Sequence, residues 1–148
     1  MDLGDVFLWR NYPFAVTGKI KDRWFLYLGT YKEDPFSDVV MLIPTATTQL
    51  HHFEAGGSRH GHSVVMISAS EGYGFEADCV LDFDEVFYDT PKSDFDRYAG
   101  DMTIKGKISS NKKMKEIYEA IIRARDVDKI IKISIRNNFK DAGIKLDQ

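Results

Sequence analysis

Three apolar runs separated by polar loops occupy residues 4–48 and constrain the chain to begin as a β-sheet. The runs cover 4–10, 24–29 and 39–44. The middle run, WFLYLG, is apolar on both faces, which is typical of a central strand. Pro44 closes the third run because proline has no amide N–H to donate to a sheet. The first part of the chain is therefore predicted to form three strands.

A cation and a group of hydroxyls stand at the ends of these runs. Arg23 begins the second strand, and Thr45, Thr47 and Thr48 close the third. Because a guanidinium donates in a planar fork that matches phosphate oxygens, this combination suits an anionic ligand such as a phosphate diester. Two ordinary interpretations stay open: Arg23 pairs with a carboxylate, Asp22 or Asp5, and the Thr45 hydroxyl bonds the backbone.

Composition restricts the class of protein. The chain has 148 residues, 43% of them hydrophobic, which fits a single domain over 1–148 with its own core. With a net charge of −3 it has no overall positive field, so a nucleic-acid site has to be a local patch. Cys79 is the single cysteine, which is typical of the reducing cytoplasm, and it is expected to be buried and inert. We expect neither a signal peptide nor a membrane span.

The rest of the chain predicts more strands and then helices. Strands are expected over 63–70, 79–89 and 102–109, with a loop or short helical turn over 90–101. From there the hydrophobic period changes from two to 3.6. The residues that predict a first helical stripe, capped by Ser109 or Ser110, are Met114, Ile117, Tyr118, Ile121 and Ile122. The residues that predict a second stripe, capped by Asp126 and ended near Gly143, are Val127, Ile130, Ile131 and Ile135.

The fold class that follows is mainly β with C-terminal helices, an α+β arrangement. We expect a small half-open barrel over 1–109, covered by helices over 110–143. The KIIKISI segment at 129–135 alternates lysine with isoleucine, so a strand stays open there as an alternative to the second helix.

All four histidines fall in or at the edges of a glycine-rich segment, residues 49–62, which is expected to be a mobile loop. They are His51, His52, His60 and His62. Their presence allows three interpretations: incidental residues of a solvated loop, a base and an acid for catalysis, or metal ligands. His60 and His62 are predicted to point to the same side of a strand start. No neighbouring cysteine or helical histidine spacing supports zinc.

Several segments together resemble the MazF/PemK (Kid-like) family of toxin ribonucleases. They are GDVFLW at 4–9, KDRWFLYLG at 21–29, VVMLIPTATT at 39–48 and KGKISSNKKMKEIYEAI at 105–121. The last is similar to the family's G-K-L-S lead into its final helix. The resemblance implies an SH3-like barrel with a C-terminal helix. It also implies metal-independent cleavage of single-stranded RNA by attack of the 2′-hydroxyl on phosphorus, with no cofactor. A homodimer and a cognate antitoxin protein as inhibitor are implied as well.

In this resemblance Arg23 holds the charge of the transition state and Thr45 donates to a phosphate oxygen, while His60 and His62 are candidate proton carriers. The candidate RNA contacts are Thr47, Thr48, His51, Asp84, Glu85 and Lys105. Asp84 and Glu85 are as readily interpreted as acids on the exposed face of a half-buried strand, and the lysines near Lys105 as a solvated helix start.

The chain departs from the family pattern in its middle. The family usually has Arg-Pro where this chain has Arg23-Trp24, and it has a glutamine and an arginine where this chain has Glu85 and Phe87. The missing cation at position 87 supports a second hypothesis, a catalytically degenerate barrel that binds RNA or a protein partner. A third hypothesis is a metal-dependent enzyme built on the histidine loop.

Overall fold

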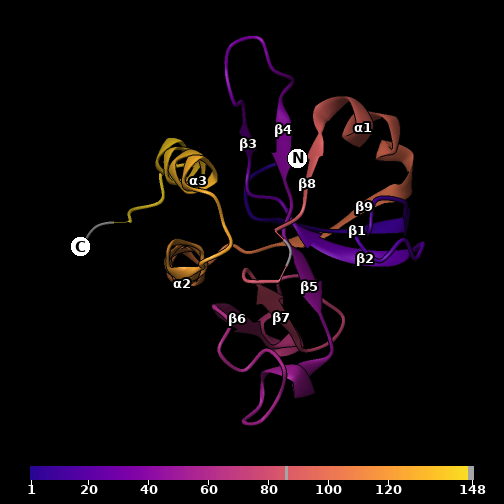
Figure 1. Ribbon diagram of the computed structural model, residues 1–148, viewed down its shortest axis with the longest axis vertical. Coiled ribbons are helices and arrows are strands. Elements are labelled where there is room, and N and C mark those ends of the chain that lie inside the picture. The colour runs from indigo at the N-terminus through magenta and orange to yellow at the C-terminus, as the bar shows by residue number, and fades with distance from the viewer. Residues whose placement is uncertain (86, 147–148) are drawn as a thin grey trace.

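The computed structural model describes residues 1–85 and 87–146, which form a mixed α+β fold (Figure 1). The strands are β1 (Asp5–Tyr12), β2 (Lys21–Leu26), β3 (Thr30–Tyr31), β4 (Val40–Leu42), β5 (Thr45–Thr47), β6 (Val64–Ile67), β7 (Cys79–Asp82), β8 (Asp89–Pro91) and β9 (Met102–Lys107). The α-helices are α1 (Lys92–Arg97), α2 (Asn111–Arg123) and α3 (Lys129–Asp141). Short 3₁₀ turns lie at η1 (Leu50–Phe53), η2 (Ala69–Glu71) and η3 (Ala99–Asp101). The predicted order, strands followed by C-terminal helices, is confirmed.

The strands form two antiparallel sheets. The larger sheet has six strands in the order β6-β7-β5-β2-β1-β9, and the smaller has three in the order β3-β4-β8. The sheets are joined where β2 runs into β3 and β4 runs into β5. At that junction Leu26 N donates to Pro44 O at 3.0 Å and Leu42 N donates to Gly29 O at 2.9 Å. The strand pairings within 1–85 and 87–146 do not close into a barrel.

Pro44 interrupts the third apolar run without ending it. β4 stops at Leu42, and the chain re-enters the larger sheet as β5 at Thr45. Proline cannot donate to a ladder, but its carbonyl can still accept, as it does here from Leu26. The run that looks like one strand in the sequence is therefore shared by two sheets.

Two hydrophobic clusters fill the molecule. An aromatic cluster lies between the small sheet, α1 and one side of β1 and β2; its buried members include Phe7, Trp9, Tyr12, Phe25 and Tyr88. An aliphatic cluster lies under α2 and α3, and it contains the buried side chains of Met114, Ile117, Ile121, Ile131 and Ile135. The aromatic cluster supports the part of β2 that carries Arg23, as described below.

The helical predictions are confirmed in type and corrected in detail. The Ser110 hydroxyl accepts from Lys113 N at 3.1 Å and caps α2, as expected. The second helix begins after Asp128, so Asp126 is not its N-cap, and the strand alternative for this segment is wrong. Ile122 and Ile130 are each 40% exposed and lie outside the buried stripes, because each sits about 100° around the helix from its buried isoleucine neighbour.

The middle of the chain is more broken than predicted. The expected strand over 63–70 is β6 followed by η2, and the one over 79–89 is two strands, β7 and β8. Val86, which the predicted strand includes, lies outside the described residues. The segment over 90–101 contains the short helix α1, as allowed. Cys79 is free and buried, and burial raises the pKa of its thiol to about 12.

Helix α3 is fastened to the junction between the sheets. The Asn138 side-chain amide donates to Leu28 O at 3.1 Å and to Thr30 O at 2.9 Å. Gly29 lies between these acceptors with a φ of +89°, and a Cβ there would be 2.5 Å from Asn138 Nδ2. The position therefore requires glycine. None of the helices in the described ranges is long and apolar enough to cross a membrane.

Candidate functional site

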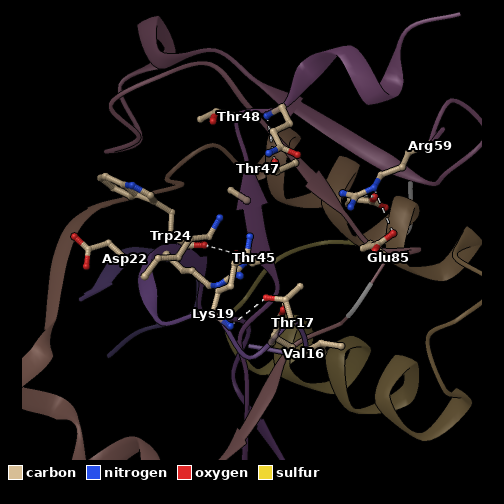
Figure 2. Close-up of a pocket in the computed structure, with 16 residues that line it drawn as sticks. Val16, Thr17, Lys19, Asp22, Trp24, Thr45, Thr47, Thr48, Arg59 and Glu85 are labelled. Carbon is tan, nitrogen blue, oxygen red and sulfur yellow. Dashed lines mark hydrogen bonds and ion pairs between the residues drawn. The ribbon is translucent and has the colours of Figure 1, made fainter. Parts of the chain in front are cut away.

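A cleft of about 440 Å³ opens where the end of β5 faces the start of β2 and the loop that precedes β6 (Figure 2). It gathers cations from two parts of the chain: Lys19, Lys21, Arg23 and Arg59. Carboxylates of Asp22, Asp82 and Glu85 and hydroxyls of Thr17, Thr45, Thr47 and Thr48 also line it. The guanidinium and the hydroxyl cluster singled out in the sequence thus share one cleft.

Strand register explains this convergence. The pairs that fix it are Trp24–Ala46, Phe25–Thr45, Ala46–Leu81 and Thr47–Val80. Because side chains alternate along a strand and directly opposed residues share a face, this register puts Arg23, Thr45 and Asp82 on one face of three adjacent strands. One strand after another therefore contributes a polar side chain to the same surface.

Arg23 is held without a protein counter-ion in the described parts of the chain. Its Cζ lies 5.9 Å from the centroid of the Tyr88 ring, and its Nε is buried with no acceptor there. Asp22 and Asp5, the carboxylates expected to compete for it, instead accept backbone N–H groups, from Asn11 at 3.0 Å and from Asp2 at 2.7 Å. An aromatic face and an unpaired donor favour an external anion at this guanidinium.

The threonines have different neighbours. The Thr45 hydroxyl donates to Trp24 O at 2.8 Å, which is the backbone interpretation of this residue. It must give up that bond to donate to a ligand. Thr47 accepts from Gln49 N at 3.2 Å, so its own hydroxyl proton stays available. Thr48 is exposed at the cleft. The hydroxyls best placed to donate to a bound anion are those of Thr47 and Thr48.

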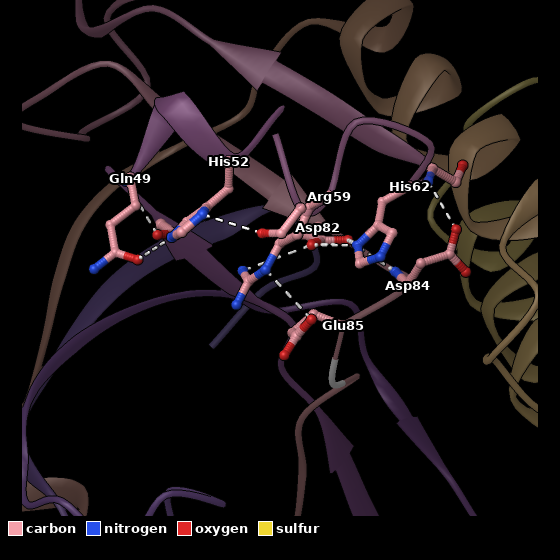
Figure 3. A network of polar contacts seen from close by, with 10 residues as sticks. Gln49, His52, Arg59, His62, Asp82, Asp84 and Glu85 are labelled. Carbon is pink, nitrogen blue, oxygen red and sulfur yellow. Dashed lines mark hydrogen bonds and ion pairs between the residues drawn. The ribbon is translucent and has the colours of Figure 1, made fainter. Parts of the chain in front are cut away.

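Figure 3 shows the polar network on the opposite side of the cleft. Asp82, only 5% exposed, accepts from His62 Nδ1 at 2.9 Å and lies 3.7 Å from Arg59 Nη1. Arg59 Nε lies 3.4 Å from a carboxylate oxygen of Glu85. A buried carboxylate is stable only with compensating donors, and Asp82 has a histidine and an arginine for this purpose. The network therefore orients both His62 and Arg59.

The four histidines do not act as one group. His51 and His52 lie in η1 with ring centroids 4.2 Å apart and ring planes tilted by 41°, and His52 contacts Gln49 and Ser58. His60 is exposed in a turn, and β6 begins only at Val64, so the predicted strand start at His60 and His62 is wrong. Within the described residues, His62 is the one of the four that contacts a carboxylate of the cleft. His51, His60 and His62 themselves are not among the residues that line it.

A metal site can be assessed from the same network. His62, Asp82 and Glu85 offer ligand atoms within 4.8 Å of one another, a spacing compatible with one cation. Arg59 already lies against both carboxylates and supplies the positive charge there. The Arg59 guanidinium therefore occupies the role that a metal cation would have beside these carboxylates, and the three side chains fit an ion-pair network better than a metal site.

Besides His51, two predicted RNA contacts lie outside the cleft. Asp84 accepts from Ser63 N at 2.7 Å and Arg125 N at 2.8 Å, which ties β6 to the connection between α2 and α3. Partial burial opposes ionisation of Asp84, but these N–H donors and that of Asp126 outweigh it and lower the pKa of the carboxyl. Lys105 is on β9, 3.9 Å from Glu76, and does not line the cleft.

Position 87 contributes no charge to the cleft. Phe87 is partly buried, packs against the aliphatic cluster and lies with its ring 6.3 Å from that of Phe83. Arg59, which sequence reasoning did not single out, is the second guanidinium of the cleft. Its signal was present in the sequence as the one arginine within the histidine-glycine segment. Imidazole titrates near neutrality, so a histidine marks a candidate proton carrier in a sequence, whereas a single loop arginine marks no particular function.

No protein-family model matches the chain, and a search of curated proteins returns no match.

Proposed function

We propose that this protein is a MazF/PemK-like endoribonuclease that cleaves single-stranded RNA without a metal. The observation that carries the proposal is the cleft in which Arg23, free of any ion pair within the described residues, faces a hydroxyl cluster. On this proposal the two antiparallel sheets correspond to the family's SH3-like barrel, and α2 corresponds to its final helix. The resemblance of the opening strands and of the segment leading into α2 supports the assignment.

The proposed reaction is an internal transesterification. The 2′-oxygen forms a bond to the adjacent phosphorus, the bond from phosphorus to the 5′-oxygen breaks, and a cyclic phosphate and a 5′-hydroxyl result. One group takes the proton of the 2′-hydroxyl and another gives a proton to the departing 5′-oxygen. Negative charge grows on the non-bridging oxygens, so a preorganised cation lowers the barrier.

Arg23 is assigned to this charge. Its guanidinium can fork onto two non-bridging oxygens, and the Tyr88 ring restricts its position. Thr47 and Thr48 donate to the same phosphate or its neighbour, and Thr45 joins them if it leaves Trp24 O. The proton carriers are drawn from Glu85, which lines the cleft, and His62, which reaches it through Asp82.

The remaining expectations rest on the resemblance. They are a homodimer whose interface borders the RNA groove, an antitoxin protein that blocks this groove, and action on messenger RNA in the cytoplasm. Lone, buried Cys79 is compatible with a reducing compartment.

The test is incubation of the purified protein with a labelled single-stranded RNA ladder, with and without EDTA. We expect cleavage that chelator does not affect, products that end in a cyclic phosphate, and loss of cleavage in Arg23→Ala. An intact ladder after long incubation at high enzyme concentration would sink the proposal.

A second candidate is a non-catalytic RNA-binding module, and the observation that favours it is Phe87, packed where the family carries a cation. It predicts that the RNA ladder stays intact while gel shifts show binding that Arg23→Ala weakens. The metal-enzyme hypothesis predicts instead that EDTA abolishes cleavage, and the ion pairs of Arg59 with Asp82 and Glu85 weigh against it.

A further inference from the structure

We infer that Arg59 is a second phosphate-binding cation of the cleft, supplied by the loop over 49–62, and that Asp82 and Glu85 are its positioning residues. The inference rests on the proposed function and deepens it. On this inference the substrate is a polyanion that contacts Arg23 on one side of the cleft and Arg59 on the other. Arg59 then supplies the positive charge that position 87 lacks.

The side chain of Arg59 is oriented without being saturated. Its distances to Asp82 and Glu85 are 3.7 Å and 3.4 Å, and it makes no side-chain hydrogen bond within the described parts of the chain. A guanidinium has five N–H donors. The carboxylates of Asp82 and Glu85 therefore orient the Arg59 guanidinium by charge, and its N–H donors remain able to hydrogen-bond a ligand.

Its surroundings also limit how far it can move. The Phe53 ring lies 6.0 Å from its Cζ, and Arg59 N donates to His52 O at 2.7 Å. The loop is folded tightly beneath it, since a Cβ at Gly57 would be 2.5 Å from His52 O. The side chain is 25% exposed. Such a group is preorganised for an anion that enters the cleft.

The two carboxylates do not cancel this role. Asp82 is shared with His62 and accepts from Asp84 N at 3.0 Å, so its charge is distributed over several donors. Glu85 is 47% exposed, and its attraction for Arg59 is weakened by water. A phosphate oxygen within hydrogen-bond distance outcompetes contacts of this length.

Position 87 gives the comparison that identifies the role. Position 87, which lies between β7 and β8, would carry a cation in the resembling family and here is Phe87, which packs on the core. Phe87 is not among the residues that line the cleft, whereas Arg59 reaches it from the loop, beside Asp82 of β7. The loop over 49–62 is then part of the catalytic apparatus.

The experiment compares Arg59→Ala and Arg59→Lys with a matched control, Arg97→Ala. Arg97 lies on α1 with an ion pair to Asp94 and does not line the cleft. We expect kcat/KM for RNA to fall by about 10²-fold in Arg59→Ala and less in Arg59→Lys. We expect no change in Arg97→Ala. Added guanidinium ion should restore part of the activity of Arg59→Ala, which a merely structural role would not allow.

The positioning role is tested by Glu85→Gln, with Asp82→Asn as the more severe variant. Both variants keep the Arg59 side chain, and both should reduce the magnitude of the slope of log K against log salt for RNA binding, as Arg59→Ala does. Loss of a proton carrier alone would leave that slope unchanged, so an unchanged slope overturns the positioning role. Cleavage by Arg59→Ala at the wild-type rate, with Arg23→Ala inactive, overturns the inference and leaves the proposed function standing.

If the wild-type protein binds RNA without cutting it, the proposed function fails and the inference is still decided by binding. Arg59→Ala should then weaken binding and reduce the magnitude of the slope of log K against log salt by about 0.7, as expected for one lost contact to single-stranded RNA. An unchanged slope overturns it.

Discussion

The two sides of the cleft are built from different kinds of interaction. On one side, Arg23 lies on β2 and Thr45 and Thr47 lie on β5, and the positions of these strands follow from paired backbone hydrogen bonds. On the other, Arg59 lies in a loop and is placed by carboxylates and by turns. We call these the strand side and the loop side. Backbone pairing fixes a side chain independently of salt and pH, whereas ion pairs respond to both.

This difference suggests a division of labour. The strand side presents a guanidinium with no described ion pair, which suits tight and specific contact with one phosphate. The loop side presents the Arg59 guanidinium beside Glu85 and beside the pair of Asp82 and His62. This arrangement suits proton transfer next to a second phosphate contact. Variants that act on one side alone can show whether the two are separable.

The largest effect is expected on the strand side. Arg23→Ala should lower kcat/KM for RNA by about 10³-fold, the upper range for loss of one preorganised donor to a developing charge. Because Arg23 makes no ion pair in the described chain and loses only its contact with Tyr88, the free energy of unfolding should change by no more than about 1 kcal/mol. Single-turnover kinetics and urea unfolding measure the two quantities.

Arg10→Ala is the matched control for this variant. Arg10 is an exposed arginine of β1 that donates to Thr103 Oγ1 at 3.0 Å and does not line the cleft. Its loss should leave cleavage unchanged. If Arg23→Ala unfolds at markedly lower urea than Arg10→Ala, Arg23 is a structural residue and the contrast between the sides is lost.

The second effect concerns the junction between the two sheets, where Gly29 packs against Asn138 of α3. Gly29→Ala should destabilise the fold by about 2–3 kcal/mol, because alanine is strained at a φ of +89° and its Cβ collides with Asn138. KM for RNA at 15 °C should stay near the wild-type value, since the cleft lies elsewhere. Thermal unfolding and cleavage assays on the same sample separate the two outcomes.

Asn138→Ala sharpens this prediction. It removes the collision together with the bonds to Leu28 O and Thr30 O, so the double variant should be less destabilised than the sum of the single variants. Strict additivity would mean that the contact between Gly29 and Asn138 does not limit position 29.

A smaller effect is expected behind the loop side. Asp84→Asn should cost about 1.5 kcal/mol at pH 7, because the ionised carboxylate accepts from Ser63 and Arg125 and the neutral amide accepts more weakly. The folded pKa of Asp84 is lowered, so its stabilising contribution is present above the unfolded carboxyl pKa of about 4. It disappears as the pH falls through the folded value.

Urea unfolding of both proteins between pH 7 and pH 3 checks the sign. The stability difference between wild type and Asp84→Asn should shrink as the pH falls. A difference that grows at low pH would contradict the role given to the carboxylate.

The strand side was predictable from the sequence and the loop side was not. Arg23 and Thr45 flank apolar runs, so pattern alone could place them on strands, and register brought them together. The predicted strand ends were wrong, because Arg23 lies inside β2 and Thr45 begins β5. Arg59 follows glycines in a segment without period, and its position depends on contact with Asp82 and Glu85, which are far along the chain. Local pattern carries no information about such a contact.

The same limit applies to Asp84. The sequence predicts it as an RNA contact, whereas in the structure it accepts from the backbone N–H groups of Ser63 and Arg125.

The smallest effect tests whether the strand side extends beyond Arg23. Lys21 is exposed at the start of β2 and lines the cleft, so it can contribute to the field that attracts RNA without contacting the reacting phosphate. Lys21→Ala should raise KM about two- to fivefold with kcat unchanged, and the difference should vanish above about 0.5 M salt, where the Debye length falls below about 5 Å. Lys140→Ala, an exposed lysine at the end of α3, is the control and should show no change. An effect of Lys21→Ala on kcat that persists in high salt would place this lysine in contact with the reacting phosphate, and the strand side would then hold two catalytic cations instead of one.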